Sequence, residues 1–378
     1  MNYLKEKKQK KGNEGRVMNN IDAVEVFMNG NAVGRIALTP DSLCAFEYNP
    51  QYLVSGKSIS PYFLPLGSGL AIAKREPFAG GFGVFDDSLP DGWGNLILDR
   101  YLKKEGCDPA KLTVLQRLAL VGSAGRGALE YKPDWSMAVV QEKIDFDRLA
   151  ADTEKILMNE DYTGDSIDNL YKYAGSSGGA RPKVFVKFEG KEWLVKFRAS
   201  MDNKNIGEIE YKYSLLAKKC GINMPETKLF EGKYFGVERF DRSPEGKIHT
   251  ISAAGLLNAD YRIPSLDYLA LLRVCHDLTK NVEEVYALFR LMTFNVAIKN
   301  RDDHAKNFSF QLIGNEWKLS PAYDILPSSG FRGYHTTTVN NTGEPKISDI
   351  FAVADNAGLS KQRVKNIIEE VNATVKFL

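Results

Sequence analysis

Residues 300–308 of the sequence read NRDDHAKNF. Within six of these positions, 302–307, lie two carboxylates, an imidazole, an ammonium group and an amide. A strongly apolar run with helical periodicity precedes the segment, and a strand-like run follows it. Packing explains such a cluster poorly, because polar groups that enter a core need hydrogen-bond partners there. This junction is therefore the first candidate for a catalytic site.

Asp302 and Asn307 are five positions apart, which is the spacing of the catalytic-loop pair in protein kinases. The chemistry explains the spacing, since the aspartate accepts a hydroxyl proton while the asparagine faces a metal ion held on the phosphates. The pattern alone is weak and is expected by chance in a chain of this size. Asp324, in SPAYD at 320–324, adds weight because kinases place a second metal carboxylate one hairpin later. By itself Asp324 also fits a turn aspartate.

Lys196 lies in the strand-like run WLVKF at 193–197. Such a lysine is commonly solvated, but kinases use a strand lysine to hold the α- and β-phosphates and pair it with a helix glutamate. The helix predicted next along the chain offers two candidates, Glu208 and Glu210. The stretch GSSGGARPK at 175–183 comes before this strand. Its glycines let backbone N–H groups approach phosphate, although the pattern is neither a Walker loop nor G-x-G-x-x-G. A flexible linker is the alternative interpretation.

The remaining pattern predicts a chain of mixed α and β structure. Two apolar runs around a Gly-Asn turn near residue 30 indicate an N-terminal hairpin. The runs at 184–188 and 193–197 indicate a second hairpin, and a further small hairpin is predicted around Gly314. A helical pattern over 266–300 breaks near Lys280. The predicted strands are 24–28, 33–38, 43–48, 184–188, 193–197, 228–231, 234–239, 308–312 and 317–319, and the other predicted helices lie within 86–104, 112–121, 146–158, 208–220 and 361–375.

Composition excludes several classes of protein. The 378 residues suggest two or three domains at roughly 100–200 residues each. No run approaches the ~20 apolar residues that span a bilayer, and the net charge of +2 does not by itself indicate nucleic-acid binding. The four scattered cysteines argue against a zinc knuckle or a disulfide scaffold and favour reduced thiols in the cytoplasm. They are Cys44, Cys107, Cys220 and Cys275. The lysine-rich residues 4–16 predict a solvated tail rather than a nucleic-acid-binding arm.

Several motifs together make the chain resemble the HipA family of serine/threonine-protein kinase toxins. They are VERFDR at 237–242, DDHAKNF at 302–308 and AYD at 322–324, with VGR at 33–35, FGVFDDSLPDGWG at 82–94 and GALEY at 127–131 in the N-terminal half. The resemblance covers roughly residues 20–375. It implies an α+β fold, with a protein-kinase-like, two-lobed nucleotide-binding domain beside a mixed α/β N-terminal domain. The implied boundaries are a flexible basic tail at 1–17, a HipA-type α/β domain at 18–145, and a kinase-like domain at 146–378 whose strand-rich lobe covers about 170–242 and whose helical lobe covers about 265–378.

The resemblance also implies roles for individual residues. Asp302 is the expected catalytic base, and Asn307 and Asp324 are the expected Mg²⁺ ligands. The expected ATP-binding residues are Gly178, Gly179, Ala180, Arg181, Pro182, Lys183, Lys196, Glu238, Arg239, Phe240, His304, Ala305, Lys306, Asn307, Tyr323 and Asp324. Glu210 is the expected ion-pair partner of Lys196, with Glu208 as the alternative. Ser176 is the expected autophosphorylation site, and the adjacent Ser177 offers a second hydroxyl.

The implied function is an ATP- and Mg²⁺-dependent serine/threonine kinase that is the toxin of a toxin–antitoxin pair. It would phosphorylate itself and a component of translation, such as an aminoacyl-tRNA synthetase, and so lead to growth arrest and persistence. The implied partner is a helix-turn-helix antitoxin resembling HipB, with operator DNA bound mainly through that antitoxin, in the cytoplasm and without a membrane. Two alternatives stay open: a catalytically quiet co-repressor that binds antitoxin and DNA, and a kinase acting on a small molecule. The presence of Asp302, Asn307, Asp324 and Lys196 together argues against the first.

Overall fold

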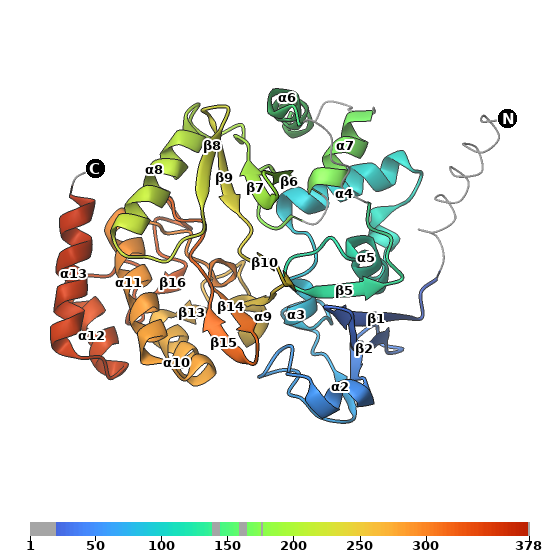
Figure 1. Cartoon of the computed structure of the whole chain (residues 1–378), viewed down its shortest axis with the longest axis horizontal. Helices are drawn as coiled ribbons and strands as arrows, with labels where there is room; N and C mark the ends of the chain where they lie inside the picture. The colour runs from blue at the N-terminus through green and yellow to red at the C-terminus, as the bar shows by residue number, and fades with distance from the viewer. Residues whose placement is uncertain (1–19, 138–143, 159–164, 175–176, 377–378) are drawn as a thin grey trace. The chain divides into compact units, whose positions relative to one another are not determined.

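The computed structural model describes residues 20–137, 144–158, 165–174 and 177–376 (Figure 1). The chain divides into two compact units, Met1–Asp202 and Asn203–Leu378. The tail predicted at 1–17 and the predicted phosphorylation site Ser176 lie outside the described residues. The boundary at residue 145 inferred from the sequence stays a prediction.

An antiparallel sheet organises the first unit, and its order among the described residues is β4-β3-β2-β1-β5. Its strands are β1 (Ala23–Met28), β2 (Asn31–Leu38), β3 (Cys44–Tyr48), β4 (Leu70–Ile72) and β5 (Leu129–Lys132). The predicted N-terminal hairpin is confirmed as the pair β1 and β2. Its turn uses Asn29 and Gly30, both in the left-handed region that a tight hairpin turn requires. The alternate side chains of Val24 and Val26 in β1 are fully buried, as are those of Val33 and Ile36 in β2, which gives the sheet one core face.

Helices of the first unit cover this sheet and support a second hairpin. They are α2 (Pro50–Ser55), α3 (Gly83–Asp86), α4 (Gly92–Lys104), η1 (Pro109–Lys111), α5 (Val114–Val121), α6 (Phe146–Leu157) and α7 (Asp165–Ala174). α5 packs on β1, β2 and β5 and starts with a reciprocal capping box between Thr113 and Gln116. The second predicted hairpin is confirmed as β6 (Lys183–Phe188) and β7 (Lys191–Lys196). α7, which packs on α4 and β6, was not predicted from the sequence.

The second unit begins with a helix laid on a hairpin. α8 (Ile206–Lys219) packs on β8 (Thr227–Phe230) and β9 (Tyr234–Glu238). Gly207 allows this close approach, because a Cβ atom there would lie 2.1 Å from the carbonyl oxygen of Lys233. The predicted helix at 208–220 and the two predicted strands are thereby confirmed.

The helical part of the second unit gathers α10 (Tyr268–Thr279), α11 (Val282–Ile298), α12 (Ile347–Asn356) and α13 (Lys361–Val375) into one layer (Figure 1). Lys280 ends α10 in the left-handed conformation and Asn281 caps α11, so the break predicted near residue 280 is confirmed. α11 is apolar on most of its surface because α10 and α13 pack against it. Among the described residues, no helix combines the length and apolar composition that crossing a bilayer requires.

The remaining elements of the second unit are short. They are β10 (Arg242–Ser243), β11 (Gly246–Lys247), β12 (His249–Ser252), α9 (Ala253–Leu257), β13 (Leu266–Asp267), η2 (Ala305–Asn307), β14 (Ser309–Ile313), β15 (Glu316–Leu319) and β16 (Thr337–Thr338). β14 lies between β12 and β15 and pairs with both in antiparallel register. The segment NRDDHAKNF therefore connects the end of the buried helix α11 to the centre of this sheet, and two rigid elements hold its ends.

Candidate active site

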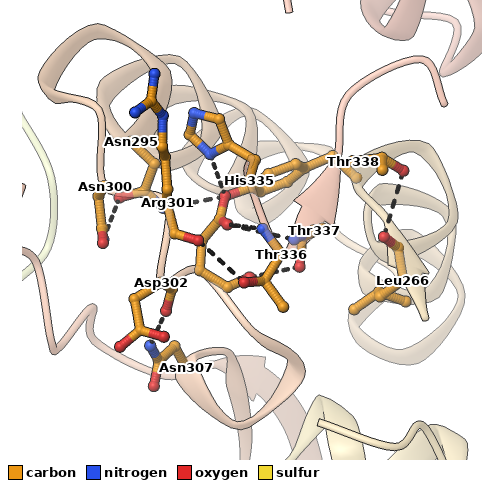
Figure 2. A network of polar contacts seen from close by, with 12 residues as sticks. Leu266, Asn295, Asn300, Arg301, Asp302, Asn307, His335, Thr336, Thr337 and Thr338 are labelled. Atoms are coloured by element: carbon orange, nitrogen blue, oxygen red, sulfur yellow. Dashed lines mark hydrogen bonds and ion pairs between the residues drawn. The ribbon is translucent and has the colours of Figure 1, made fainter. Parts of the chain in front are cut away.

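Two adjacent aspartates of the segment have opposite environments. Asp302 is exposed, whereas Asp303 is fully buried. Asn307, five positions after Asp302, donates its side-chain amide to the Asp302 carbonyl oxygen at 2.6 Å (Figure 2). This bond uses the nitrogen of the amide, so the amide oxygen is the atom of Asn307 suited to a cation. This bond holds the Asn307 side chain against the backbone of Asp302, and the catalytic roles of both residues stay predictions.

Asp324 lies next to the same segment and has a strained backbone. Its φ of 53° is in the left-handed region, which aspartate tolerates better than most residues do. Asn300, two positions before Asp302, donates to the Asp324 carbonyl oxygen at 3.2 Å. Asn300 also forms a parallel bridge with Ser328, so the chain after Asp324 runs beside the start of the segment 300–308. The exposed Asp324 carboxylate is thus tied through its backbone to the segment that carries Asp302.

An aromatic pair connects Phe240, one of the predicted ATP-binding residues, to residues 300–308. The rings of Phe240 and Tyr323 stack with their centroids 5.4 Å apart. The Tyr323 hydroxyl donates to the Lys306 carbonyl oxygen at 2.6 Å and lies 2.5 Å from the Ser309 hydroxyl. Gln311 donates to the Phe240 carbonyl oxygen at 2.9 Å. Phe240, Tyr323 and the segment 300–308 therefore form one cluster within the second unit.

Buried charges fix the chain just after β9. The side chains of Arg239 and Asp241 form two hydrogen bonds, at 3.0 and 2.8 Å, and both are nearly inaccessible to solvent. Arg242 adds a bond of 3.0 Å to the same carboxylate. Arg239 was predicted to bind ATP, and the structure places its guanidinium on Asp241. Glu238, at the end of β9, donates its backbone N–H to the Glu226 carbonyl oxygen.

The centre of the segment packs on the loop after α9. Ala305 is buried with Ala254 and Ala259. The Lys306 ammonium lies 4.0 Å from the centre of the Tyr261 ring, a distance at which cation–π attraction is effective. The His304 ring is 6.0 Å from the same tyrosine, and its Nδ1 is buried without a hydrogen-bond partner among the described residues. Tyr261 was not predicted as a site residue, because its contacts with His304 and Lys306 join positions more than 40 residues apart and leave no local sequence pattern.

The glycine-rich loop of the first unit is held by the start of α4. The Gly179 N–H donates to the Asp91 carboxylate. Trp93 donates its backbone N–H to the Gly179 carbonyl oxygen and its indole N–H to the Lys183 carbonyl oxygen, both at 3.0 Å. Gly178, Gly179 and Ala180 are exposed, whereas Pro182 and Lys183 are buried. Asp91 and Trp93 belong to the motif FGVFDDSLPDGWG at 82–94. The sequence did not indicate that this motif binds the glycine-rich loop.

Charged side chains and a serine complete the loop. The Lys183 ammonium donates to the Gly178 carbonyl oxygen, and Arg181 pairs with Asp202 at 3.2 Å. Ser177 is fully buried, and its hydroxyl donates to the Ala174 carbonyl oxygen at 2.7 Å. Lys196, at the end of β7, is half-buried.

The two candidate partners of Lys196 differ in burial. Glu210 of α8 is 4% exposed, whereas Glu208 is half-buried. A buried carboxylate needs compensation more than a half-buried one does, which favours Glu210. The ion pair with Lys196 stays a prediction.

The second unit offers oxygen ligands that suit a hard cation such as Mg²⁺ bound to a phosphate group. In the described part of the chain, no group of three or more His, Cys, Asp or Glu side chains is arranged to hold a metal ion. Mg²⁺ is commonly bound by one or two carboxylates together with substrate phosphates and water. The Asn307 amide oxygen and the Asp324 carboxylate are oxygen donors of this kind, so the residues fit Mg²⁺ carried on a nucleotide.

Comparison with known proteins gives the class of fold first. The structure matches a HipA toxin from Shewanella oneidensis MR-1, solved with HipB and its operator DNA, at a TM-score of 0.68 and 19% sequence identity. The match covers 93% of this chain and 88% of that one. It confirms the predicted α+β, kinase-like fold.

The chain belongs to the HipA family. A family model described as the HipA-like C-terminal domain matches residues 175–377, and one described as the HipA N-terminal domain matches residues 24–132. A curated protein of Sinorhizobium fredii named "Putative kinase Y4dM" is 22% identical over 394 residues, covering 96% of this chain and 88% of that protein. The predicted family is therefore confirmed.

Proposed function

We propose that the chain is an ATP- and Mg²⁺-dependent serine/threonine-protein kinase that acts as the toxin of a toxin–antitoxin pair. The observation that carries this proposal is the arrangement around Asp302. The exposed Asp302 is bonded through its carbonyl to Asn307, and the exposed Asp324 is bonded through its carbonyl to Asn300. A base and two oxygen donors for a metal thus share one rigid frame, which is what phosphoryl transfer needs.

Each residue then has a defined task. Asp302 accepts the proton of the attacking hydroxyl and orients that hydroxyl. Asn307 and Asp324 would hold Mg²⁺, which would supply neutralisation of the charge on the phosphates. The tyrosine of the Phe240–Tyr323 stack is anchored by its hydroxyl, so the pair offers a fixed aromatic surface for adenine.

The phosphates are assigned to residues of the first unit. Gly178–Lys183 supplies backbone N–H groups and two cations, and Lys196 supplies a third, with Glu210 as its partner. The Gly179 N–H already donates to a carboxylate, that of Asp91. This contact supports the assignment, because it shows that the loop presents an N–H group to an anion.

The partners follow from the relative of known structure. The Shewanella oneidensis HipA was solved with HipB and operator DNA. We assign to this chain a helix-turn-helix antitoxin of the same kind, with DNA contacted mainly through the antitoxin, which fits a net charge of only +2. The proposed substrate is a component of translation, such as an aminoacyl-tRNA synthetase, in the cytoplasm.

Autophosphorylation at Ser176 is proposed to switch the kinase off. A phosphoserine adds about −1.5 to −2 charges beside the loop, where it repels nucleotide phosphates and competes for Lys183 and Arg181. ATP affinity is expected to be lower for protein phosphorylated at Ser176 than for the same protein after phosphatase treatment. Equal affinities and equal rates for the two forms contradict the switch, and label found only on Ser177 moves it by one residue.

One experiment separates this function from its two alternatives. The full chain is incubated with γ-labelled ATP and Mg²⁺ in a cell extract, and labelled proteins and metabolites are identified by mass spectrometry. Label on serine or threonine of proteins is the expected result. Label confined to a metabolite supports a small-molecule kinase. The absence of any label, with antitoxin still bound, supports a catalytically quiet co-repressor.

A further inference from the structure

Asp303, the residue after the proposed base, is a fully buried carboxylate that accepts four hydrogen bonds. Its Oδ2 lies 2.9 Å from both the Tyr268 hydroxyl and the His335 Nδ1. Its Oδ1 accepts from the backbone N–H groups of Thr336 at 2.9 Å and Thr337 at 3.2 Å. A carboxylate can only accept, so His335 carries its hydrogen on Nδ1. The four donors compensate a charge that would otherwise be costly to bury.

The same threonines bind the backbone on both sides of Asp302 (Figure 2). The Arg301 carbonyl oxygen accepts from the Thr336 N–H at 3.2 Å and from its hydroxyl at 3.0 Å. The Asp303 carbonyl oxygen accepts from the Thr337 hydroxyl at 2.5 Å. The carbonyl groups of the two residues next to Asp302 are therefore held in place, while the Asp302 side chain is exposed.

The threonine segment is anchored in turn at the start of α10. Thr337 and Thr338 form β16, which pairs in parallel with Leu266 and Asp267 of β13. The Thr338 hydroxyl also donates to the Asp267 carboxylate at 2.6 Å. This pairing prevents the threonine segment from moving independently of the helical layer.

A buried chain of hydrogen bonds continues from Asp303 to Asp324. Tyr268 donates to Asp303, and the Asn295 side chain donates to the Tyr268 hydroxyl at 3.0 Å. Asn300 donates to the Asn295 side-chain oxygen at 3.1 Å and to the Asp324 carbonyl oxygen at 3.2 Å. Burial raises the pKa of Tyr268 far above its usual value, so the hydroxyl keeps the proton it donates. Tyr268, Asn295 and Asn300 are all nearly inaccessible to solvent.

We propose that Asp303 and Tyr268 are positioning residues that hold the base Asp302 and the metal carboxylate Asp324 in one fixed geometry. The inference rests on the proposed kinase function for the roles of Asp302 and Asp324, but the network itself is independent of it. A core does not need such a network for stability, because apolar residues of the same volume commonly stabilise a core as well as buried charges do. A polar network with every member satisfied instead makes the local structure rigid and unique.

The test removes one hydroxyl and keeps the ring. In Tyr268→Phe, the edge-to-face packing of residue 268 on Phe308 is retained while the link between Asp303 and Asn295 is lost. Tyr286→Phe is the matched control, because Tyr286 is also buried and its hydroxyl also accepts a hydrogen bond, from the Ser360 N–H, away from the site. Misplacement of reacting groups by about 1 Å costs on the order of 100-fold in rate. We expect kcat of Tyr268→Phe to fall by roughly 10- to 100-fold, with a KM for ATP and a Tm close to those of Tyr286→Phe.

Hydrogen exchange gives a second readout that does not depend on activity. Peptides covering 300–308 and 333–340 are expected to exchange faster in Tyr268→Phe than in the parent and in Tyr286→Phe. An unchanged kcat together with unchanged exchange overturns the proposal. The proposal is also overturned if Tyr268→Phe does not fold while Tyr286→Phe does, because the Tyr268 hydroxyl is then required for folding. If the parent transfers no phosphate, the proposed function fails, and exchange alone then decides the network.

Discussion

At the scale of single residues, the site depends on carboxylates whose surroundings differ sharply. Asp302 and Asp324 are exposed, as a base and a metal ligand need to be. Asp303 is buried under four donors and has no route to a substrate. Burial and hydrogen bonding, rather than residue type, therefore distinguish the proposed base and the proposed metal ligand from the carboxylate that we propose positions them.

Replacement of Asp324 tests the metal role. Asp324→Asn keeps the left-handed conformation, which asparagine also tolerates, and removes the charge. ATP affinity measured calorimetrically in Mg²⁺ is expected to fall by at least about 10-fold, since residues that organise a metal site commonly contribute 10- to 100-fold to affinity. ATP affinity without Mg²⁺ is expected to change little.

The control for this substitution is Asp277→Asn, at an exposed carboxylate near the end of α10. It should leave the Mg²⁺ dependence as in the parent. If Asp324→Asn also keeps the Mg²⁺ dependence of the parent, Asp324 does not bind the metal.

At the scale of elements, the turn that starts α4 contacts the glycine-rich loop and holds it in place. A Cβ atom on Gly94 would lie 2.2 Å from the Ser177 carbonyl oxygen, and one on Gly92 would lie 2.8 Å from the Ala180 Cα. Two glycines on either side of Trp93 therefore let the loop approach the backbone of the helix. This contact between an N-terminal motif and the loop fixes where Gly178–Lys183 can present its donors.

Gly94→Ala is expected to displace the loop. Forcing a methyl group into a filled space commonly destabilises a protein by about 1–3 kcal/mol, so Tm should fall, and ATP affinity should fall with it. Gly67→Ala is the matched control, because a Cβ atom there meets no atom within 4 Å. Equal Tm and equal ATP affinity in the two variants would show that the position of the loop does not depend on its contact with the start of α4.

The elements that could be predicted are those with a strong periodic pattern. α8, α11 and α13 each carry a clear apolar face or core, and the hairpins are marked by glycine and asparagine turns. α7 and α9 could not be predicted, because their short sequences acquire a partner only in the fold: α7 packs on α4, and α9 on the catalytic segment. The roles of Asp302, Asn307 and Asp324 were predicted from their spacing and from the family resemblance, and they stay predictions. Tyr268 and His335 lie more than 30 positions from Asp303, so the local sequence pattern did not indicate them.

At the scale of the whole molecule, all four cysteines are free and buried. Burial raises the pKa of Cys44 to about 11 and that of Cys275 to about 12. The pKa values of Cys107 and Cys220 are also raised, with burial as the main cause. Since the thiolate is the reactive form, a thiol with a raised pKa is mostly protonated and inert at pH 8.

A thiol titration checks this arrangement. The native chain is expected to react slowly with an aromatic disulfide reagent at pH 8, and the denatured chain to release four equivalents. Reactivity should increase as the pH rises toward 11, because the raised pKa values delay formation of thiolate. Fast reaction of the native chain contradicts the burial of the thiols, and fewer than four equivalents after denaturation contradicts their free state.

Residues 300–308 are proposed as the catalytic segment of a kinase, with Asp302 as its base. The most direct test measures single-turnover transfer of the γ-phosphate from labelled ATP by the parent and by Asp302→Asn, with MgATP affinity measured in parallel. A lost general base lowers the rate by roughly 10²- to 10⁴-fold, and MgATP affinity should persist because Asn307 and Asp324 remain. Transfer by Asp302→Asn within about threefold of the parent, a loss far smaller than a general base accounts for, would contradict the assignment of Asp302 as the base.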